Sequence, residues 1–258
     1  MSRPFLLREK TSPYLTAPHG TKMSRRARVV LPGIPHHITQ RGIRRFDVFR
    51  DGADRQIYLK LLAESCRMFH LRVCAYCLMT NHVHLVAIPE RPDSLWRTLH
   101  RCHGMYANRF NMKYGFSGHL WQARPYSCVL DEEHLWRAIR YVELNPVRAH
   151  IVDRAVDYLW SSAAAHCGLR EDTLLDAEWA SRDEIQDWRQ WLAPGNENEV
   201  DKRIRERTFT GRPCGNETFV REAERLIGRQ LSPRKPGPKP KKAKPDDSAI
   251  WTTDEIRF

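Results

Sequence analysis

The chain lacks any apolar run long enough to cross a membrane. A spanning helix needs roughly 18 or more consecutive apolar residues, and none of the 258 residues begins such a run. The apolar patch near the N-terminus, Phe5–Leu7, is too short for the core of a signal peptide. We therefore expect a cytoplasmic protein with no membrane partner.

The sequence also lacks the cysteine pattern of a disulfide framework or of a zinc site. Its seven cysteines are an odd number at irregular spacings, so we expect reduced thiols. Cys74 and Cys77 have the spacing of half a zinc site, but no second pair of this kind follows. Alternation along a strand would place these two thiols on opposite faces, which disfavours their binding one metal ion.

Acidic residues are scarce relative to basic ones. The chain has 31 Asp and Glu against 43 Lys and Arg, which gives a formal charge of +12. This excess favours a polyanionic partner, most often nucleic acid, over a basic protein that has no special partner. We expect the protein to be associated with the nucleoid.

Composition divides the chain into four segments. Residues 1–22 are polar and without periodicity, so we expect a disordered arm. Residues 23–168 carry the regular alternation of strands and helices, and residues 169–230 suggest a helical C-terminal extension. Residues 231–258 are rich in Lys and Pro at their start and are expected to form a disordered basic tail.

The apolar pattern predicts the element order β-α-β-β-α-β-α. Strands are expected within 27–41, 71–88 (two strands) and 117–130, and helices within 53–69, 93–115 and 131–146. Asp51 and Asp54 are candidate caps of the first helix, and Pro146 is expected to end the third. This order is that of a ferredoxin-like or RRM-like split βαβ sandwich with an antiparallel sheet, so the predicted class is α+β.

Two histidines on one expected strand give the first functional signal. His82 and His84 are separated by one residue, so both side chains project from the same face of a strand. Two imidazoles placed in this way are suited to bind one divalent ion. Two half-buried histidines that donate to backbone carbonyls would produce the same pattern.

A second signal lies on the helix expected at 131–146. Tyr141 and Asn145 are four residues apart and share a face, with His134 and Arg137 on the same side. The opposite stripe, which we expect to pack on the sheet, consists of Leu135, Ala138, Ile139 and Val142. The polar stripe is therefore predicted to face away from the core. A phenol beside a metal-binding amide would suit attack on a phosphodiester.

Five segments in series resemble the REP-associated tyrosine transposases, which belong to the single-tyrosine HUH transposase superfamily. The segments are GIPHHITQRG (33–42), MTNHVHLV (79–86), LWQARPYSCVL (120–130), YVELNPVR (141–148) and WSS (160–162). Together they cover roughly residues 23–168 in the expected order. An H-x-H pair alone is common by chance, whereas the five in series are specific.

The resemblance implies a catalytic domain in residues 23–168, with Tyr141 as the nucleophile. It implies that His82, His84 and Asn145 bind a divalent ion, either Mg²⁺ or Mn²⁺. Members of this family are endonucleases and strand transferases that cleave single-stranded DNA, often beside a short hairpin such as a REP element. They form a 5′-phosphotyrosine link and later rejoin the strand. The implied partner is hairpin-bearing single-stranded DNA, and the enzyme is expected to be a monomer or a homodimer.

Further polar residues are candidates for contacts with DNA. They are His36, Thr39, Gln40, Arg41, Arg44 and Arg45 near the first strand, Arg101 and Arg109 on the second helix, Arg124, Arg137, and Lys239, Lys241 and Lys242 in the tail. Ordinary charged loops and a solubilising tail would carry the same residue types. We also expect the extension at 169–230 to help bind DNA.

Other function classes remain open on the sequence alone. One is a non-catalytic protein that binds hairpin DNA or RNA and derives from a transposase; the intact Tyr141, His82 and His84 disfavour it. Another is a metal-dependent nuclease that uses water, which the absence of a covalent DNA adduct would distinguish. An RNA-binding regulator on this fold would need aromatic pairs on its central strands, where this chain has imidazoles.

Overall fold

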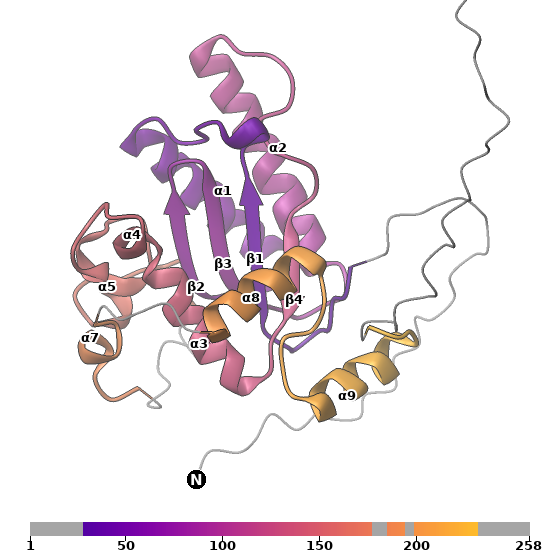
Figure 1. Cartoon of the computed structure of the whole chain (residues 1–258). Helices are drawn as coiled ribbons and strands as arrows, with labels where there is room; N and C mark the ends of the chain where they lie inside the picture. Colours follow the sequence, from indigo (N-terminus) through magenta and orange to yellow (C-terminus); the bar gives the residue numbers. More distant parts are fainter. Residues whose placement is uncertain (1–27, 177–184, 194–198, 232–258) are drawn as a thin grey trace, which may run out of the picture.

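The computed structural model describes residues 28–176, 185–193 and 199–231. Its centre is a four-stranded sheet in the order β2-β3-β1-β4, in which every neighbouring pair is antiparallel (Figure 1). The strands are β1 (His36–Arg41), β2 (Leu71–Met79), β3 (His82–Pro89) and β4 (Tyr126–Val129). This order confirms the predicted ferredoxin-like α+β class.

Two long helices, α1 (Gly52–Phe69) and α2 (Ser94–Tyr114), cover one face of the sheet. α1 begins with a capping box, in which the Asp51 carboxylate accepts a hydrogen bond from Asp54 N at 2.8 Å and Asp54 returns one. Both predicted caps are therefore confirmed. Alternate strand residues such as Ile38 and Leu85 form the core beneath these helices.

The opposite face of the sheet is covered by α3 (Glu132–Glu143) and by α8 (Glu199–Thr210). Cys77 and Val86 from the strands pack there against Leu135 and Ile139 of α3. α8 comes from the C-terminal part of the chain and lies across β4 and β1, next to α3 (Figure 1). The sheet is thus enclosed on both sides, and this second layer holds the site described below.

The third predicted helix ends earlier than expected. α3 stops at Glu143, and Asn145 begins a separate short helix, α4 (Asn145–Arg148). Pro146 lies in the first turn of α4, where the missing N–H of proline costs no hydrogen bond. The prediction that Pro146 ends the helix is therefore wrong, and Tyr141 and Asn145 lie on two successive helices.

An irregularity in β2 changes the faces of its cysteines. The pairing of β2 with β3 shifts between Val73 and Ala75, as at a β-bulge. As a result Cys74 packs in the same layer as Cys77, on the side covered by α3. The prediction that these two thiols lie on opposite faces is wrong, because simple alternation does not survive an extra residue in the ladder.

The rest of the described chain consists of short elements around this core. They are η1 (Ile43–Arg45), η2 (Ala155–Asp157), α5 (Ala163–His166), α7 (Trp188–Trp191) and α9 (Glu217–Ile227). Helices α7, α8 and α9 lie within residues 169–230, where the sequence predicts a C-terminal extension, while the predicted arm and tail lie outside the described residues. No helix in the described ranges is both long enough and apolar enough to span a membrane.

Candidate active site

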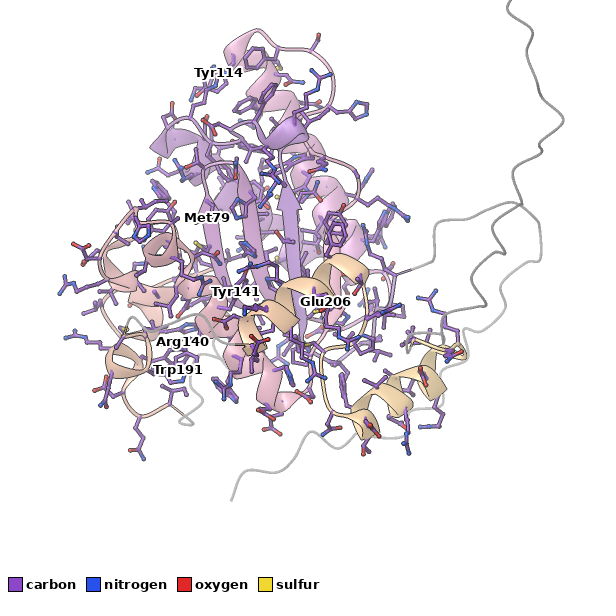
Figure 2. All side chains as sticks on the ribbon, in the orientation of Figure 1. Met79, Tyr114, Arg140, Tyr141, Trp191 and Glu206 are labelled. Atoms are coloured by element: carbon purple, nitrogen blue, oxygen red, sulfur yellow. The ribbon has the colours of Figure 1, made fainter. Side chains whose placement is uncertain are left out.

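Strand β3 and helix α3 bring the two signals from the sequence together. His82 and His84 project from the sheet face that α3 covers, and their ring centroids are 4.9 Å apart. The Tyr141 ring lies 5.7 Å from the His84 ring, in an edge-on arrangement. Figure 2 shows Tyr141 next to α8, toward the lower end of the sheet in that view. The fold thus joins the histidine pair and the tyrosine in one site.

The orientation of α3 differs from the prediction. Tyr141 is only 5% exposed and His134 only 7%, so the polar stripe does not face away from the core. The reason is that α3 has two neighbours, the sheet and α8, and a helix with two neighbours buries more than one stripe. Arg137 is exposed, as expected for a residue on the outer side.

Arg148 and His37 complete the surroundings of Tyr141. The Arg148 guanidinium carbon lies 4.4 Å from the Tyr141 ring centroid, a cation–π contact, and Arg148 also donates to the Tyr141 carbonyl. The His37 ring meets the Tyr141 ring edge-on at 5.7 Å. Sequence reasoning did not single out either residue, although both lie within the segments 33–42 and 141–148 that carry the family resemblance.

Burial keeps the imidazoles of this site neutral. It lowers the pKa of His82 to about 4, with a further contribution from the charge of Arg41. Burial also lowers the pKa of His84 well below its ordinary value and that of His37 to about 3. Neutral imidazole is the form that binds metal ions, so His82 and His84 are ready to act as ligands near pH 7.

The hydrogen bonds of His82 determine which of its nitrogens is free. Asn81 donates from Nδ2 to the Arg45 carbonyl at 3.1 Å, which turns its Oδ1 toward the His82 ring. His82 Nδ1 lies 2.6 Å from that oxygen and so carries the hydrogen that is donated. The Nε2 lone pair of His82 is therefore available to a metal ion.

Asn145 is the third candidate ligand and is oriented by the end of α3. Its Nδ2 donates to the carbonyls of Tyr141 at 3.0 Å and Val142 at 3.2 Å, which leaves Oδ1 as the atom available for a cation. No three His, Cys, Asp or Glu side chains in the described part of the chain are grouped to hold a metal ion. A donor set of two imidazoles and an amide oxygen fits Mn²⁺, and fits Mg²⁺ when water completes the shell.

The predicted DNA contacts on β1 divide between the two faces of the strand. His36 is fully buried, with Nδ1 2.7 Å from the Ile34 carbonyl and Nε2 accepting from Leu31 N. This burial contradicts the prediction that His36 contacts DNA, because neither nitrogen is left for a ligand. Gln40 is also buried and donates to the carbonyls of residues 122 and 123.

Several of the other predicted DNA contacts are more exposed to solvent. Arg41 is half-buried and pairs in register with His82, so it lies at the site. Thr39 is half-buried and donates to the Val83 carbonyl, and the side chains of Arg44, Arg45 and Arg124 are exposed. Arg101 and Arg109 lie on α2, on the far side of the sheet from Tyr141. The predicted contacts Lys239, Lys241 and Lys242 lie outside the described residues.

A basic groove beside β4 was not foreseen from the sequence. We call it the β4 groove: a hollow of about 560 Å³ lined by residues that include Arg28, Arg124, Tyr126, Phe209 and Arg212. Its Tyr126 and Phe209 rings are stacked with centroids 5.0 Å apart, and Phe209 is 68% exposed. Burial, together with the nearby Arg124 charge, lowers the pKa of Arg28 to about 10, which marks two guanidinium groups held close together.

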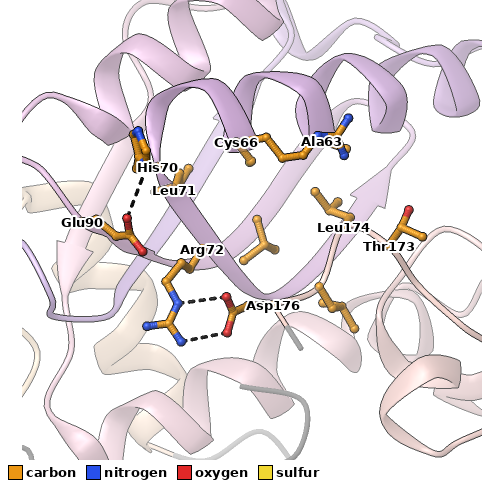
Figure 3. A pocket seen from close by; sticks show the side chains of 12 residues that line it. Ala63, Cys66, His70, Leu71, Arg72, Glu90, Thr173, Leu174 and Asp176 are labelled. Atoms are coloured by element: carbon orange, nitrogen blue, oxygen red, sulfur yellow. Dashed lines mark hydrogen bonds and ion pairs between the residues drawn. The ribbon is translucent and has the colours of Figure 1, made fainter. Parts of the chain in front are cut away.

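A second cavity, of about 320 Å³, lies between the end of α1 and the edge of β2. Figure 3 shows two charge pairs in its lining: Arg72 donates to both Asp176 oxygens at 2.8 and 2.9 Å, and His70 contacts Glu90 at 3.5 Å. The first pair fastens the segment around Asp176 to β2. We interpret this cavity as part of the scaffold.

Comparison with known proteins gives one family match and several similar solved structures. Residues 32–145 match the model of the family described as transposase, IS200-like. A REP-associated tyrosine transposase bound to a REP hairpin is similar at 16% identity and a TM-score of 0.47, over 60% of this chain and 98% of that chain. A Deinococcus radiodurans protein described as a transposase is similar at 17% identity and a TM-score of 0.34, over 46% of this chain and 96% of that chain. No curated protein matches the chain.

Proposed function

Because residues 32–145 of this chain belong to the family of IS200-like transposases, we propose that the protein cleaves and rejoins single-stranded DNA beside short REP-like hairpins. The observation that carries this proposal is the Tyr141 ring 5.7 Å from His84, on a helix that follows the sheet in sequence. Residues 23–168 form the proposed catalytic domain. Tyr141 is the proposed nucleophile, and the extension at 169–230 is proposed to assist DNA binding.

The proposed reaction requires few chemical groups from the protein. Tyr141 Oη bonds to the scissile phosphorus as the phenol proton leaves, and the bond from phosphorus to the 3′-oxygen breaks. That oxygen takes up a proton and becomes a free 3′-hydroxyl, while the 5′ end stays on Tyr141. Attack by another 3′-hydroxyl reverses the step and joins two strands. No energy cofactor is needed, because the phosphotyrosine keeps the energy of the broken ester bond.

The proposed metal ligands are His82 Nε2, His84 Nε2 and Asn145 Oδ1. A bound Mg²⁺ or Mn²⁺ would neutralise charge on the non-bridging phosphate oxygens and make the phosphorus easier to attack. The chain's own contribution is positional: β3 presents the two imidazoles, α3 presents the phenol beside them, and Asn145 begins α4 directly after α3. Arg148 adds a fixed positive charge over the Tyr141 ring.

The β4 groove supports single-stranded DNA as the substrate. Stacked aromatic rings bind unpaired bases without regard to sequence, and arginines bind the backbone phosphates. The groove offers both through Phe209, Tyr126 and Arg124, and Arg41 leads from β1 toward the histidines. We propose that Arg41, Arg44, Arg45 and Arg124 contact DNA, as the sequence predicts.

The test is a search for a covalent link between protein and DNA. Labelled single-stranded hairpin oligonucleotides from the sequence flanking the gene are incubated with the protein in Mn²⁺ or in EDTA. The wild type is compared with Tyr141→Phe and with Tyr114→Phe, a control on α2, on the far side of the sheet, that also loses one phenolic hydroxyl. We expect a covalent band on a denaturing gel in Mn²⁺ for the wild type and the control only.

Two other outcomes would replace the proposal. Cleavage without a covalent band that persists in Tyr141→Phe would indicate a nuclease that uses water. Tight binding without cleavage in any metal would indicate a DNA-binding protein derived from a transposase.

A further inference from the structure

A chain of hydrogen bonds connects helix α8 to the proposed metal ligand His84. Thr208 Oγ1 lies 2.7 Å from the Ile204 carbonyl and 2.7 Å from His37 Nδ1. His37 Nε2 lies 3.0 Å from His84 Nδ1. We propose that Thr208, acting through His37, fixes the tautomer of His84 that leaves its Nε2 bare for a metal ion.

The direction of each hydrogen bond in this series follows from the bond between Thr208 and the Ile204 carbonyl. A backbone carbonyl only accepts, so the single hydroxyl hydrogen of Thr208 points to Ile204. Toward His37 the hydroxyl must then accept, and His37 Nδ1 carries the hydrogen. His37 is buried, and among the described residues its ring nitrogens contact Thr208 and His84 and no carboxylate, so nothing there would stabilise a second ring hydrogen and Nε2 has a lone pair. His84 Nδ1 therefore donates, and His84 Nε2 carries no hydrogen.

Two further contacts agree with this polarity. The Cys128 sulfur lies 3.2 Å from Thr208 Oγ1, where a thiol hydrogen is available for donation to the second lone pair of the hydroxyl. The His37 and His84 rings are within 11° of parallel, with centroids 5.2 Å apart, so the bond between them lies near both ring planes. All the participants are buried, and water does not compete for these bonds.

This arrangement assigns a role to α8 that differs from DNA binding. Metal-binding histidines commonly donate their other ring hydrogen to a partner that orients them, and loss of that partner weakens metal binding. Here the partner of His84 is the His37 imidazole. Its Nε2 can accept or donate a hydrogen bond, depending on which group contacts its Nδ1. Thr208 removes that ambiguity, and we therefore describe Thr208 and His37 as positioning residues.

The inference rests on the proposed function only for the identity of the metal ligands, so its test begins without metal. The metal-free full-length protein is labelled with ¹⁵N-histidine, and long-range proton–nitrogen spectra report which nitrogen of each ring carries hydrogen. We expect His84 in the wild type to carry hydrogen on Nδ1 alone. Hydrogen on Nε2 of His84 would overturn the proposal without any variant being made.

The variants test the role of the hydroxyl. Thr208→Val keeps the shape but removes the acceptor, and we expect mixed tautomers of His84 and Mn²⁺ affinity lower by about 10- to 100-fold, measured by electron paramagnetic resonance. Thr208→Ser restores the hydroxyl and should restore both readouts.

Thr210→Val is the matched control for the helix. Thr210 donates to the Glu206 carbonyl on the exposed side of α8, the same type of bond that Thr208 makes to Ile204. Its loss should change neither the tautomer nor the Mn²⁺ affinity. Unchanged tautomer and affinity in Thr208→Val, or equal losses in Thr210→Val, would refute the role of Thr208. A wild type with the expected tautomer but no covalent DNA adduct would count against the proposed function only.

Discussion

The N-terminus of α3 contains an ion pair whose effect on stability depends on pH. Asp131 caps the helix, and its Oδ1 accepts from His134 N at 2.9 Å and contacts His134 Nδ1 at 2.7 Å. Its Oδ2 accepts from Asn216 N, which ties the C-terminal extension to the helix. The hydrogen bond to Asp131, with a contribution from Cys214, raises the pKa of His134 to about 9.

The sign and size of the effect follow from this shift. A group whose pKa is higher in the folded state stabilises the fold fully below its unfolded pKa, here 6.5, and loses that effect as pH rises through about 9. A shift of this size corresponds to about 3 kcal/mol of unfolding free energy. We therefore expect the protein to be less stable at pH 9.5 than at pH 6.5 by an amount of this order.

Urea unfolding at a series of pH values between these limits measures the effect. Burial opposes a raised pKa of His166, but contact with Glu143 raises it on balance, so His166 contributes in the same direction. The comparison with His134→Gln isolates the contribution of His134, since the variant should show a flatter pH profile. His119→Gln, at an exposed position, is the control and should follow the wild type. Equal pH profiles for the wild type and His134→Gln would refute this reasoning.

Two further predictions concern the β4 groove and the core under α1 and α2. Phe209→Ala should weaken binding of oligo-dT by about 5- to 150-fold, because stacking on one ring contributes roughly 1–3 kcal/mol. Fluorescence anisotropy measures this binding, and an equal loss in the exposed Phe116→Ala would show that stacking at Phe209 is not the cause. Tyr58→Phe removes the buried bond between Tyr58 Oη and His103 Nε2, 3.0 Å long, and should lower the unfolding free energy by about 1–3 kcal/mol. A change near zero in urea unfolding would contradict the second prediction.

Local sequence patterns determined most of the elements. A period of two residues placed His82 and His84 on one face of a strand, and the strand indeed presents both to one layer. The capping residues Asp51 and Asp54 marked the start of α1 within a residue. These features depend on neighbours along the chain, which explains why the element order and the ferredoxin-like class could be predicted.

The wrong predictions have a common cause, which is that each depends on contacts outside the element concerned. Tyr141 was expected on an outward stripe, because amphipathic reasoning assumes that a helix has one buried side. Cys74 and Cys77 were expected on opposite faces, because alternation assumes an unbroken ladder. In both cases the deciding contact lies outside the element itself: α8, far along the chain, for Tyr141, and the irregular pairing with the next strand, β3, for the cysteines.

The sequence by itself determined the chemistry available to this protein: two imidazoles on one strand, a phenol and an amide four residues apart, and an excess of positive charge. The tertiary structure alone decided that the phenol meets the imidazoles and that Thr208 lies behind them through His37. The physical reason is that the sequence alone fixes the chemical type of each side chain. Its neighbours, its burial and the tautomer that it adopts depend on which distant segments pack around it.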